Sequence, residues 1–429
     1  MPNLKLSSNS NAKEEINSDK TKQKASIMTG RGLLLMSIIG ISFSLRAPIT
    51  SIGPLAGLIH ADLGVSNGFI GFITTLPLIA FSICSPFIPR ISSRIGIGQT
   101  MLFGLVFIVA GGVMRSYTGT IGLLAGTALI GVGISAANVL IPSIVKLKYP
   151  ERIGIITSTY ITAMAVFASI AAGASYPLAS SGLGWKTASA VWIGIAFLAI
   201  FAWFPQRKLG AYSLGEDMQT ISASEVMDHG QNRKAVEKNI WRSSLAWYLT
   251  LFMGFQSLNY YSLTAWIPSM LQGNGMAPEM AGYMAFWFQL IGIPFSFITP
   301  ILASRVKNQR TIVISACIGY FLGLGILLVF HSTAAVAVAL LFLANGGTAS
   351  FSWSMVMISL KAKDAQEAVK LSGMCQAVGY LLAAIGPTLC GAIYDSTETW
   401  MIVMGLFLGT TVIMVVTGIL AAKREKLFN

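Results

Sequence analysis

The sequence predicts an all-α membrane protein with twelve transmembrane helices in two halves of six. Three observations lead to this prediction. Only 10% of the 429 residues are charged and 54% are hydrophobic, whereas soluble domains carry about 25% charged residues. Apolar runs long enough to cross a bilayer occur twelve times along the chain. One long polar stretch, 205–242, divides these runs into two equal groups.

The predicted spans follow one another with short connections inside each half. In the first half they cover roughly 33–60, 67–89, 96–114, 120–145, 153–180 and 186–204. In the second half they cover roughly 243–271, 280–303, 311–330, 333–358, 371–393 and 399–421. The remaining parts are polar: we expect a disordered cytoplasmic tail over 1–32, a cytoplasmic central loop over 205–242 and a second tail over 422–429.

The distribution of basic residues predicts the sidedness of these spans. All but three of the 29 Lys and Arg residues fall on one side if the spans alternate in direction. Arg115 and Lys186 are placed on the other side, and Arg46 lies inside the first span. Basic loops stay in the cytoplasm, so we expect a multi-pass protein of the cell membrane with both termini cytoplasmic. The net charge of +13 then indicates topology and attraction to membrane lipid, not a nucleic-acid partner.

A spacing of 214 residues relates the two halves. Four positions recur at this spacing: Arg46 and Tyr260, Pro54 and Pro268, Pro86 and Pro300, and Gly133 and Gly347. Two halves of the same orientation are typical of transporters that rock around a binding site near the membrane midplane.

Enzyme motifs are missing from the sequence. There is no Gly-Lys dipeptide, which excludes a phosphate-binding P-loop and an ATP-driven pump. Gly131 to Ala136 match a loose dinucleotide fingerprint, but they lie inside a span without a preceding strand, which favours close helix packing. The His and Cys residues lack metal-ligand spacing. We therefore expect a protein that is not an enzyme and that holds no metal or cofactor.

Arg46 is the main candidate for function. An Arg near the bilayer centre costs about 2.5–3.5 kcal/mol on insertion scales, so it should face the interior of the bundle. Every Asp and Glu lies in a tail, in a loop or at the end of a span, which leaves no obvious carboxylate partner at the midplane. Carbonyl groups, Tyr or Asn could satisfy Arg46 structurally. We favour the alternative, in which Arg46 anchors an anionic or strongly dipolar solute.

Other polar and aromatic side chains could complete a solute-binding site around Arg46. The candidates are Thr50, Asn138, Gln256, Asn259, Tyr260, Trp266, Gln289, Asn345, Gln376 and Tyr380. Several share a helix face by their i, i+3 or i+4 spacing, among them the stripe of Gln256, Asn259 and Tyr260. Single amides inside spans also form hydrogen bonds between helices. Both roles therefore stay open for Asn138, Gln289 and Asn345. The interior of the spans contains no acidic or His side chains that could relay protons. This favours facilitated diffusion, exchange, or a coupled transport in which Arg46 or the solute itself carries the charge.

Twelve spans divided six plus six, with basic turns after spans 2 and 8, resemble the major facilitator superfamily. The turns are "PRISSRIG" (Pro89 to Gly96) and "SRVKNQR" (Ser304 to Arg310). They keep basic residues of the superfamily's Gly-x3-Asp-Arg-x-Gly-Arg-Lys/Arg signature, but the acidic residue is missing. The resemblance implies the major facilitator fold and a gating role at the cytoplasmic turns for Arg90, Arg94, Arg305 and Lys307.

Within this superfamily the chain resembles the cyanate/nitroimidazole transporter branch. The resemblance is carried by "RAPITSIGPL", "ANVLIPSIVKLKYP" and "LSGMCQAVGYLLAAIGP", among other stretches between 33 and 421. It implies a permease of the cytoplasmic membrane for a small anionic or polar solute, such as a cyanate-like anion or a small nitro-heterocycle. We expect this permease to work by alternating access and to act as a monomer. One alternative is a multidrug exporter of the same fold, in which Arg46 is structural. A second alternative, a membrane-embedded enzyme or sensor, would need a nucleophile cluster, a metal site or a soluble module.

Overall fold

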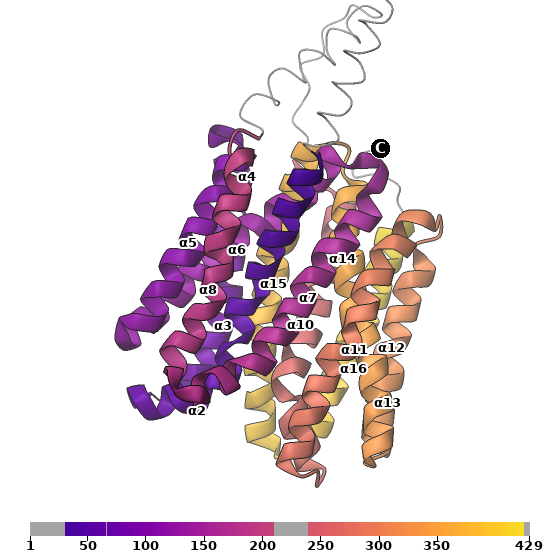
Figure 1. Ribbon diagram of the computed structural model, residues 1–429. Coiled ribbons are helices and arrows are strands. Elements are labelled where there is room, and N and C mark those ends of the chain that lie inside the picture. Colours follow the sequence, from indigo (N-terminus) through magenta and orange to yellow (C-terminus); the bar gives the residue numbers. More distant parts are fainter. Residues whose placement is uncertain (1–30, 66, 210–238, 424–429) are drawn as a thin grey trace, which may run out of the picture.

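The computed structural model describes residues 31–65, 67–209 and 239–423, and the regular structure in these ranges is helical. Most of the predicted tails and central loop lies outside the described residues. In Figure 1 most helices of residues 31–203 lie on the left of the bundle and most of those of 244–423 on the right, while α7, α10 and α15 overlap in the middle of the view. The described part of the chain therefore forms two helical halves with an interface between them.

Every predicted span coincides with a helix or with an interrupted helix. The first half contains the helix Arg31–Thr50, α2 (Ile52–Leu63), α3 (Asn67–Cys84), α4 (Ile88–Ile95), α5 (Ile97–Tyr117), α6 (Gly119–Lys148), η1 (Pro150–Arg152), α7 (Ile153–Leu178), η2 (Ala179–Leu183), α8 (Gly184–Trp203) and η3 (Phe204–Gln206). The second half contains η4 (Ile240–Arg242), α10 (Ser244–Gly273), α11 (Pro278–Arg305), α12 (Arg310–Val329), α13 (Thr333–Ala344), η5 (Asn345–Ala349), α14 (Ser350–Lys361), α15 (Ala365–Thr397) and α16 (Trp400–Lys423).

Hydropathy and length mark most of these helices as membrane spans. Among the described residues, nine continuous helical stretches could cross a membrane, or ten if the bent pair α3 and α4 forms one span. One stretch, Pro150–Gln206, contains both α7 and α8. α10 is not among them, because its amide, hydroxyl and tyrosine side chains make it a less apolar helix.

The first span is interrupted at Ser51, between the helix Arg31–Thr50 and α2. Pro48 and Pro54 lack the backbone N–H that would bond the carbonyl groups four residues earlier, so the helical ladder is weakened on both sides of Ser51. Arg46 therefore lies just before a break, on a turn that depends on other parts of the protein for its position.

The predicted end of the third span placed Arg115 in an outer loop, but in the structure this residue lies inside a helix. α5 continues to Tyr117, three residues past the predicted end of the third span, so Arg115 belongs to its last turn. Its side chain is only 1% exposed.

Glycine contacts hold the first half together. α5 and α6 approach closely at Gly104 and Gly133, where a Cβ on Gly104 would lie 2.9 Å from the Gly133 carbonyl oxygen. Gly111 and Gly126 repeat this contact farther along the same pair of helices. Small residues allow such close approach of helices in membranes. The helix-packing interpretation of the Gly131 to Ala136 segment is therefore confirmed.

The two ends of the bundle differ. α4 and the C-terminal end of the described chain lie at one end of the bundle (Figure 1). We call it the basic end, because Arg90, Arg94, Arg305 and Lys307 are exposed there. At the opposite end Asp62 forms an ion pair with Lys186 (3.1 Å), which joins α2 to α8 within the first half.

Hydroxyl groups join the two halves toward the basic end. Ser143 of α6 donates to the carbonyl of Ala365 (2.8 Å), and Ser359 of α14 donates to the carbonyl of Pro142 (2.9 Å). Ser158 of α7 donates to a carbonyl of α11, that of Phe297. These bonds use neutral side chains and backbone carbonyls, and they hold the halves together on this side of Arg46.

Candidate functional site

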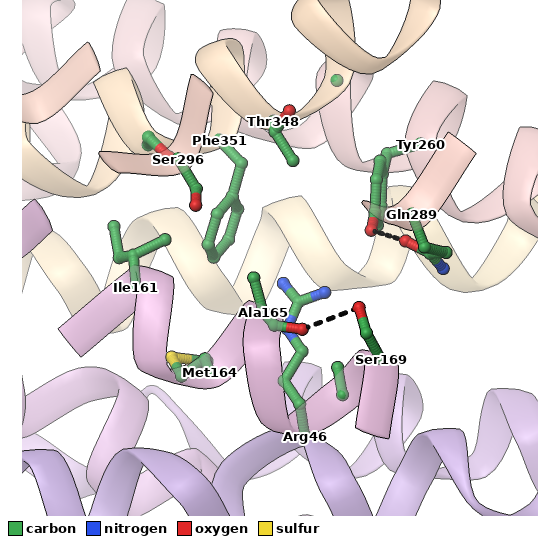
Figure 2. A pocket seen from close by; sticks show the side chains of 13 residues that line it. Arg46, Ile161, Met164, Ala165, Ser169, Tyr260, Gln289, Ser296, Thr348 and Phe351 are labelled. Atoms are coloured by element: carbon green, nitrogen blue, oxygen red, sulfur yellow. Dashed lines mark hydrogen bonds between the residues drawn. The ribbon is translucent and has the colours of Figure 1, made fainter. Parts of the chain in front are cut away.

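Arg46 projects from the middle of the first span into the interface between the halves (Figure 2). It lines a cavity with about 490 Å³ of empty volume. Helices of both halves contribute the other walls: Ile161, Met164, Ala165, Ala168 and Ser169 from α7, Tyr260 from α10, Gln289 and Ser296 from α11, and Gly347, Thr348, Phe351 and Ser352 from η5 and α14.

Aromatic rings surround the Arg46 guanidinium. Its Cζ atom lies 5.0 Å from the centroid of the Phe351 ring, 5.9 Å from that of Tyr260 and 6.0 Å from that of Tyr261. Rings at this distance attract a cation through their electron-rich faces. Among the residues that the structure describes, no carboxylate forms an ion pair with Arg46. The cation thus keeps hydrogen-bonding capacity for an anion or a dipolar group in the cavity.

Tyr260 connects Arg46 to the second half. Its hydroxyl group hydrogen-bonds the Gln289 Oε1 atom (2.7 Å), drawn as a dashed line in Figure 2. As the donor in this bond, the hydroxyl keeps its own oxygen free to accept from Arg46, which lies within reach. Arg46 and Tyr260 occupy equivalent positions at the 214-residue spacing, and in the structure they face each other across the interface.

A second cavity, with about 350 Å³ of empty volume, lies on another side of Arg46. Thr50, Asn138, Phe81, Tyr261 and Tyr380 line it. The rings of Phe81 and Tyr380, which come from opposite halves, pack at 4.9 Å.

A π-helical segment, η5, shapes the cavity from the side of the second half. Gly347 in this segment lies under the Tyr260 ring, where an added Cβ would be 2.7 Å from the ring. The neighbouring Thr348 lines the cavity. π segments occur often at functional sites, since the extra residue per turn redirects side chains. Here it makes room for the ring that contacts Arg46.

The structure brings together only part of the predicted site. The predicted residues that line one of the two cavities are Arg46, Thr50, Asn138, Tyr260, Gln289 and Tyr380. The predicted residues that line neither are Gln256, Asn259, Trp266, Asn345 and Gln376.

The five residues outside the cavities have structural contacts inside the second half. Asn259 accepts a hydrogen bond from Thr410 of α16 (2.7 Å), and Trp266 donates to the Pro387 carbonyl (2.8 Å). Asn345 donates to the Ser315 carbonyl of α12 (3.3 Å). These bonds pack helices against one another, and for Asn345 this is the alternative role left open for a single amide.

Gln256 and Gln376 are buried and share a further property. Each donates through Nε2 to a nearby serine, Ser257 (2.6 Å) and Ser372 (2.8 Å) respectively. Each leaves its Oε1 atom without a hydrogen-bond partner. The structure places both side chains outside the cavities.

Several lining residues were not predicted. Phe351 and Met164 are apolar, and Ser169, Ser296 and Thr348 resemble many other small polar residues in the spans, so nothing in the sequence singles them out. Tyr261 is different, because it is a tyrosine inside a span and directly follows Tyr260, so the sequence offers a signal for it.

A groove leads from the cavity toward the opposite end. It lies between α7 and α11, has about 850 Å³ of empty volume, and is lined by apolar residues that include Gly173, Pro177 and Phe286. Ser169 lines both the groove and the Arg46 cavity. The cavity is thus closed by contacts toward the basic end, and the groove adjoins it at Ser169 on the opposite side.

Comparison with known proteins points to one family. The model of the family described as Major Facilitator Superfamily matches residues 33–387. The chain is 40% identical to an uncharacterized transporter, YycB, of Bacillus subtilis, over 92% of this chain and 95% of that protein. It is 32% identical to the 2-nitroimidazole transporter of Escherichia coli (92% and 97% covered) and 22% identical to the cyanate transport protein CynX of the same organism (86% and 91%).

Solved structures share the architecture. The proton:xylose symporter XylE superposes with a TM-score of 0.71 over 93% of this chain and 95% of that chain, at 16% sequence identity. At this identity the similarity concerns the fold alone, which is the twelve-helix fold predicted from the sequence.

Proposed function

The chain belongs to the major facilitator superfamily, and from this premise we propose that it carries a small anionic or strongly dipolar solute across the cytoplasmic membrane, with Arg46 as the solute anchor. The observation that carries the proposal is the position of Arg46. Its guanidinium lies between the halves, lines a cavity, and has aromatic rings instead of a carboxylate around it among the described residues. The protein is a transporter and not an enzyme.

The chemistry of the guanidinium narrows the class of solute. Its planar fork donates two parallel hydrogen bonds to groups with two oxygens, such as a carboxylate or a nitro group. The rings of Phe351 and Tyr260 supply flat apolar walls beside it. Two relatives are named for cyanate and for 2-nitroimidazole, an anion and a nitro-heterocycle. The nitro group of a nitro-heterocycle matches this fork, and cyanate offers a small anion for the cation. Together these supports favour a small solute that is anionic or strongly dipolar.

We propose that the basic end faces the cytoplasm, in keeping with the positive-inside rule. The conformation is then outward-facing, because the cavity continues through the α7–α11 groove toward the opposite end. Alternating access would require the serine-to-carbonyl bonds at the basic end to break and the groove to close. A single-chain transporter with its site between two halves can do this by rocking.

Uptake into proteoliposomes tests the proposal. We expect the purified protein to take up radiolabelled cyanate or 2-nitroimidazole faster than empty liposomes do. A solute that binds should also raise the melting temperature by mass action. The multidrug alternative predicts the reverse pattern: resistance to toxic organic cations on expression, with no uptake or thermal shift for either probe. That result would overturn the proposal.

Tyr260→Phe is expected to weaken solute binding without stopping transport. The change removes the hydroxyl that joins Gln289 to Arg46 but keeps the ring. Losing one hydrogen bond of about 1 kcal/mol corresponds to a roughly fivefold rise in KM. The measurement is the concentration dependence of uptake. Tyr283→Phe, which removes an exposed hydroxyl on the same helix as Gln289, is the matched control; equal effects of the two changes would contradict the prediction.

A further inference from the structure

Arg115 is a second buried arginine near the first span. Its Nη1 atom donates to the Pro48 carbonyl (2.5 Å), and its Nη2 atom donates to the Ser189 hydroxyl of α8 (2.9 Å). The side chain is 1% exposed, and its Nε atom has no hydrogen-bond partner.

Burial of this cation is unfavourable in itself. A charge inside the bundle is costly unless it is paired, and among the described residues no carboxylate forms an ion pair with Arg115. Asp62, a carboxylate at the same end of the bundle, is instead bound to Lys186 and to the Trp185 indole. Of its two partners, the Pro48 carbonyl is the one that favours a cation, because it lies at the end of a helix.

The Pro48 carbonyl belongs to the last turn before the break at Ser51. Carbonyl groups at a helix C-terminus lack intrahelical partners and carry partial negative charge, which favours a cation beside them. The Ser51 hydroxyl also donates to this carbonyl (3.2 Å). Arg115 thus binds the end of the helix whose last complete turns carry Arg46.

A second contact holds the same turn from the side of α7. Thr50 donates to the carbonyl of Ala168 (3.1 Å) and lies near that of Arg46 (3.2 Å). The turn is therefore attached to α7 by Thr50 and to α5 and α8 by Arg115. Because proline weakens the helical ladder on both sides of this turn, its position depends on these side-chain contacts with neighbouring helices.

We infer that Arg115 is a positioning residue: it clamps the Pro48 carbonyl at the break in the first span and so fixes the direction in which Arg46 points into the cavity. This inference rests on the proposed function, since it assigns Arg115 to the orientation of the solute anchor. Loss of the clamp lets the turn shift, which weakens solute binding before it affects the rocking of the halves.

The first test separates binding from turnover. With cyanate as the probe in proteoliposomes, Arg115→Gln should raise KM about tenfold, the size expected for loss of a charge-assisted hydrogen bond, with Vmax nearly unchanged. Arg115→Lys keeps a cation for the carbonyl and should recover most of the affinity. Ser189→Ala removes only the other bond and should have a smaller effect on KM than Arg115→Gln.

A double variant tests whether Arg115 acts through Arg46. In an Arg46→Lys background, Arg115→Gln should raise KM little further, because the effects of residues that act together are not additive. A loss of Vmax with unchanged KM, or full additivity, would overturn the inference.

The second test needs no solute. In protein whose four native cysteines are replaced by serine, Arg46→Cys can be labelled with a small water-soluble thiol reagent. Arg115→Gln should change the labelling rate several-fold, and Arg115→Lys should leave it near the starting value. An unchanged rate in both variants contradicts the clamp even if cyanate is not the solute. If wild-type protein takes up neither probe while the labelling rates change as expected, the proposed function fails and the positioning role stands. If Arg115→Gln does not fold, Arg115→Met, which also removes the cation, takes its place; an unchanged labelling rate together with an unchanged KM in that variant contradicts the inference.

Discussion

Arg46→Ala is expected to abolish uptake of cyanate and 2-nitroimidazole while leaving the melting temperature close to that of the wild type. The guanidinium has no carboxylate partner among the described residues, so its removal breaks no internal ion pair. Removing one partner of a charged, hydrogen-bonded contact with a bound anion costs about 2–5 kcal/mol of binding free energy, which corresponds to a loss of roughly 30-fold to several thousand-fold in affinity. Uptake rates and thermal unfolding of the same preparation measure both effects.

Arg46→Lys distinguishes a charge requirement from a requirement for the planar fork. Lysine keeps the positive charge but offers a single ammonium group, which cannot form two parallel hydrogen bonds. With 2-nitroimidazole as the probe, whose nitro group has two oxygens, we expect uptake well below that of the wild type, though above that of Arg46→Ala. Full uptake by Arg46→Lys would show that charge alone suffices, and uptake by Arg46→Ala would remove Arg46 from the site.

The fold was predictable because its signals are local and strong. A span needs a long apolar run, and each of the twelve predicted runs became a helix or an interrupted helix. The interruptions themselves were only partly visible. Proline marked the first one, but the π segment at Gly347 has no such marker, because its five residues include no proline.

The candidate site was predictable only in part, for a geometric reason. Helical spacing shows which residues share a face, but not which neighbour that face meets. α10 packs against α11, α15 and α16, so its polar stripe is divided among them. Tyr260 lines the cavity while Asn259, one residue earlier, bonds α16. Arg46 was identifiable because a buried charge is conspicuous whatever its neighbours are.

Arg115 shows how a small boundary error hides a residue. Ending the third span at 114 placed it in a loop, where a basic residue needs no explanation. With α5 continuing to Tyr117, the same residue becomes a buried cation with a backbone carbonyl as partner. The sequence shows that residue 115 is an arginine, but only the packing of α5 against α8 and the first helix shows where its side chain points.

Closure at the basic end depends on small residues. Pro89 and Arg90 stand where the superfamily signature has its Asp-Arg pair, and Pro89 lies against Gly373 of α15, where an added Cβ would be 3.1 Å from the proline ring. On the other side of the interface Gly154 of α7 lies against Pro300 and Ser304 of α11. Close backbone approach and hydroxyl bonds thus seal this end. Such contacts tolerate little added volume.

Gly154→Leu should therefore lock the transporter away from the conformation described here. A Cβ at this position would lie 2.6 Å from the Pro300 carbonyl oxygen, a backbone atom that cannot rotate away. The leucine side chain would hold α7 and α11 apart at the basic end. We expect uptake to fall at least about tenfold, because the conformation described here becomes costly by more than about 1.4 kcal/mol.

Ser296→Cys, placed at the cavity wall, reports the conformation. A thiol reagent added from the side of the basic end should label this cysteine in the Gly154→Leu protein, and much more slowly without that change. Gly194→Leu on α8 is the matched control, since nothing lies within 4 Å of a Cβ there. Normal uptake by Gly154→Leu, or equal labelling in both proteins, would show that closure of α7 against α11 is not part of the transport cycle.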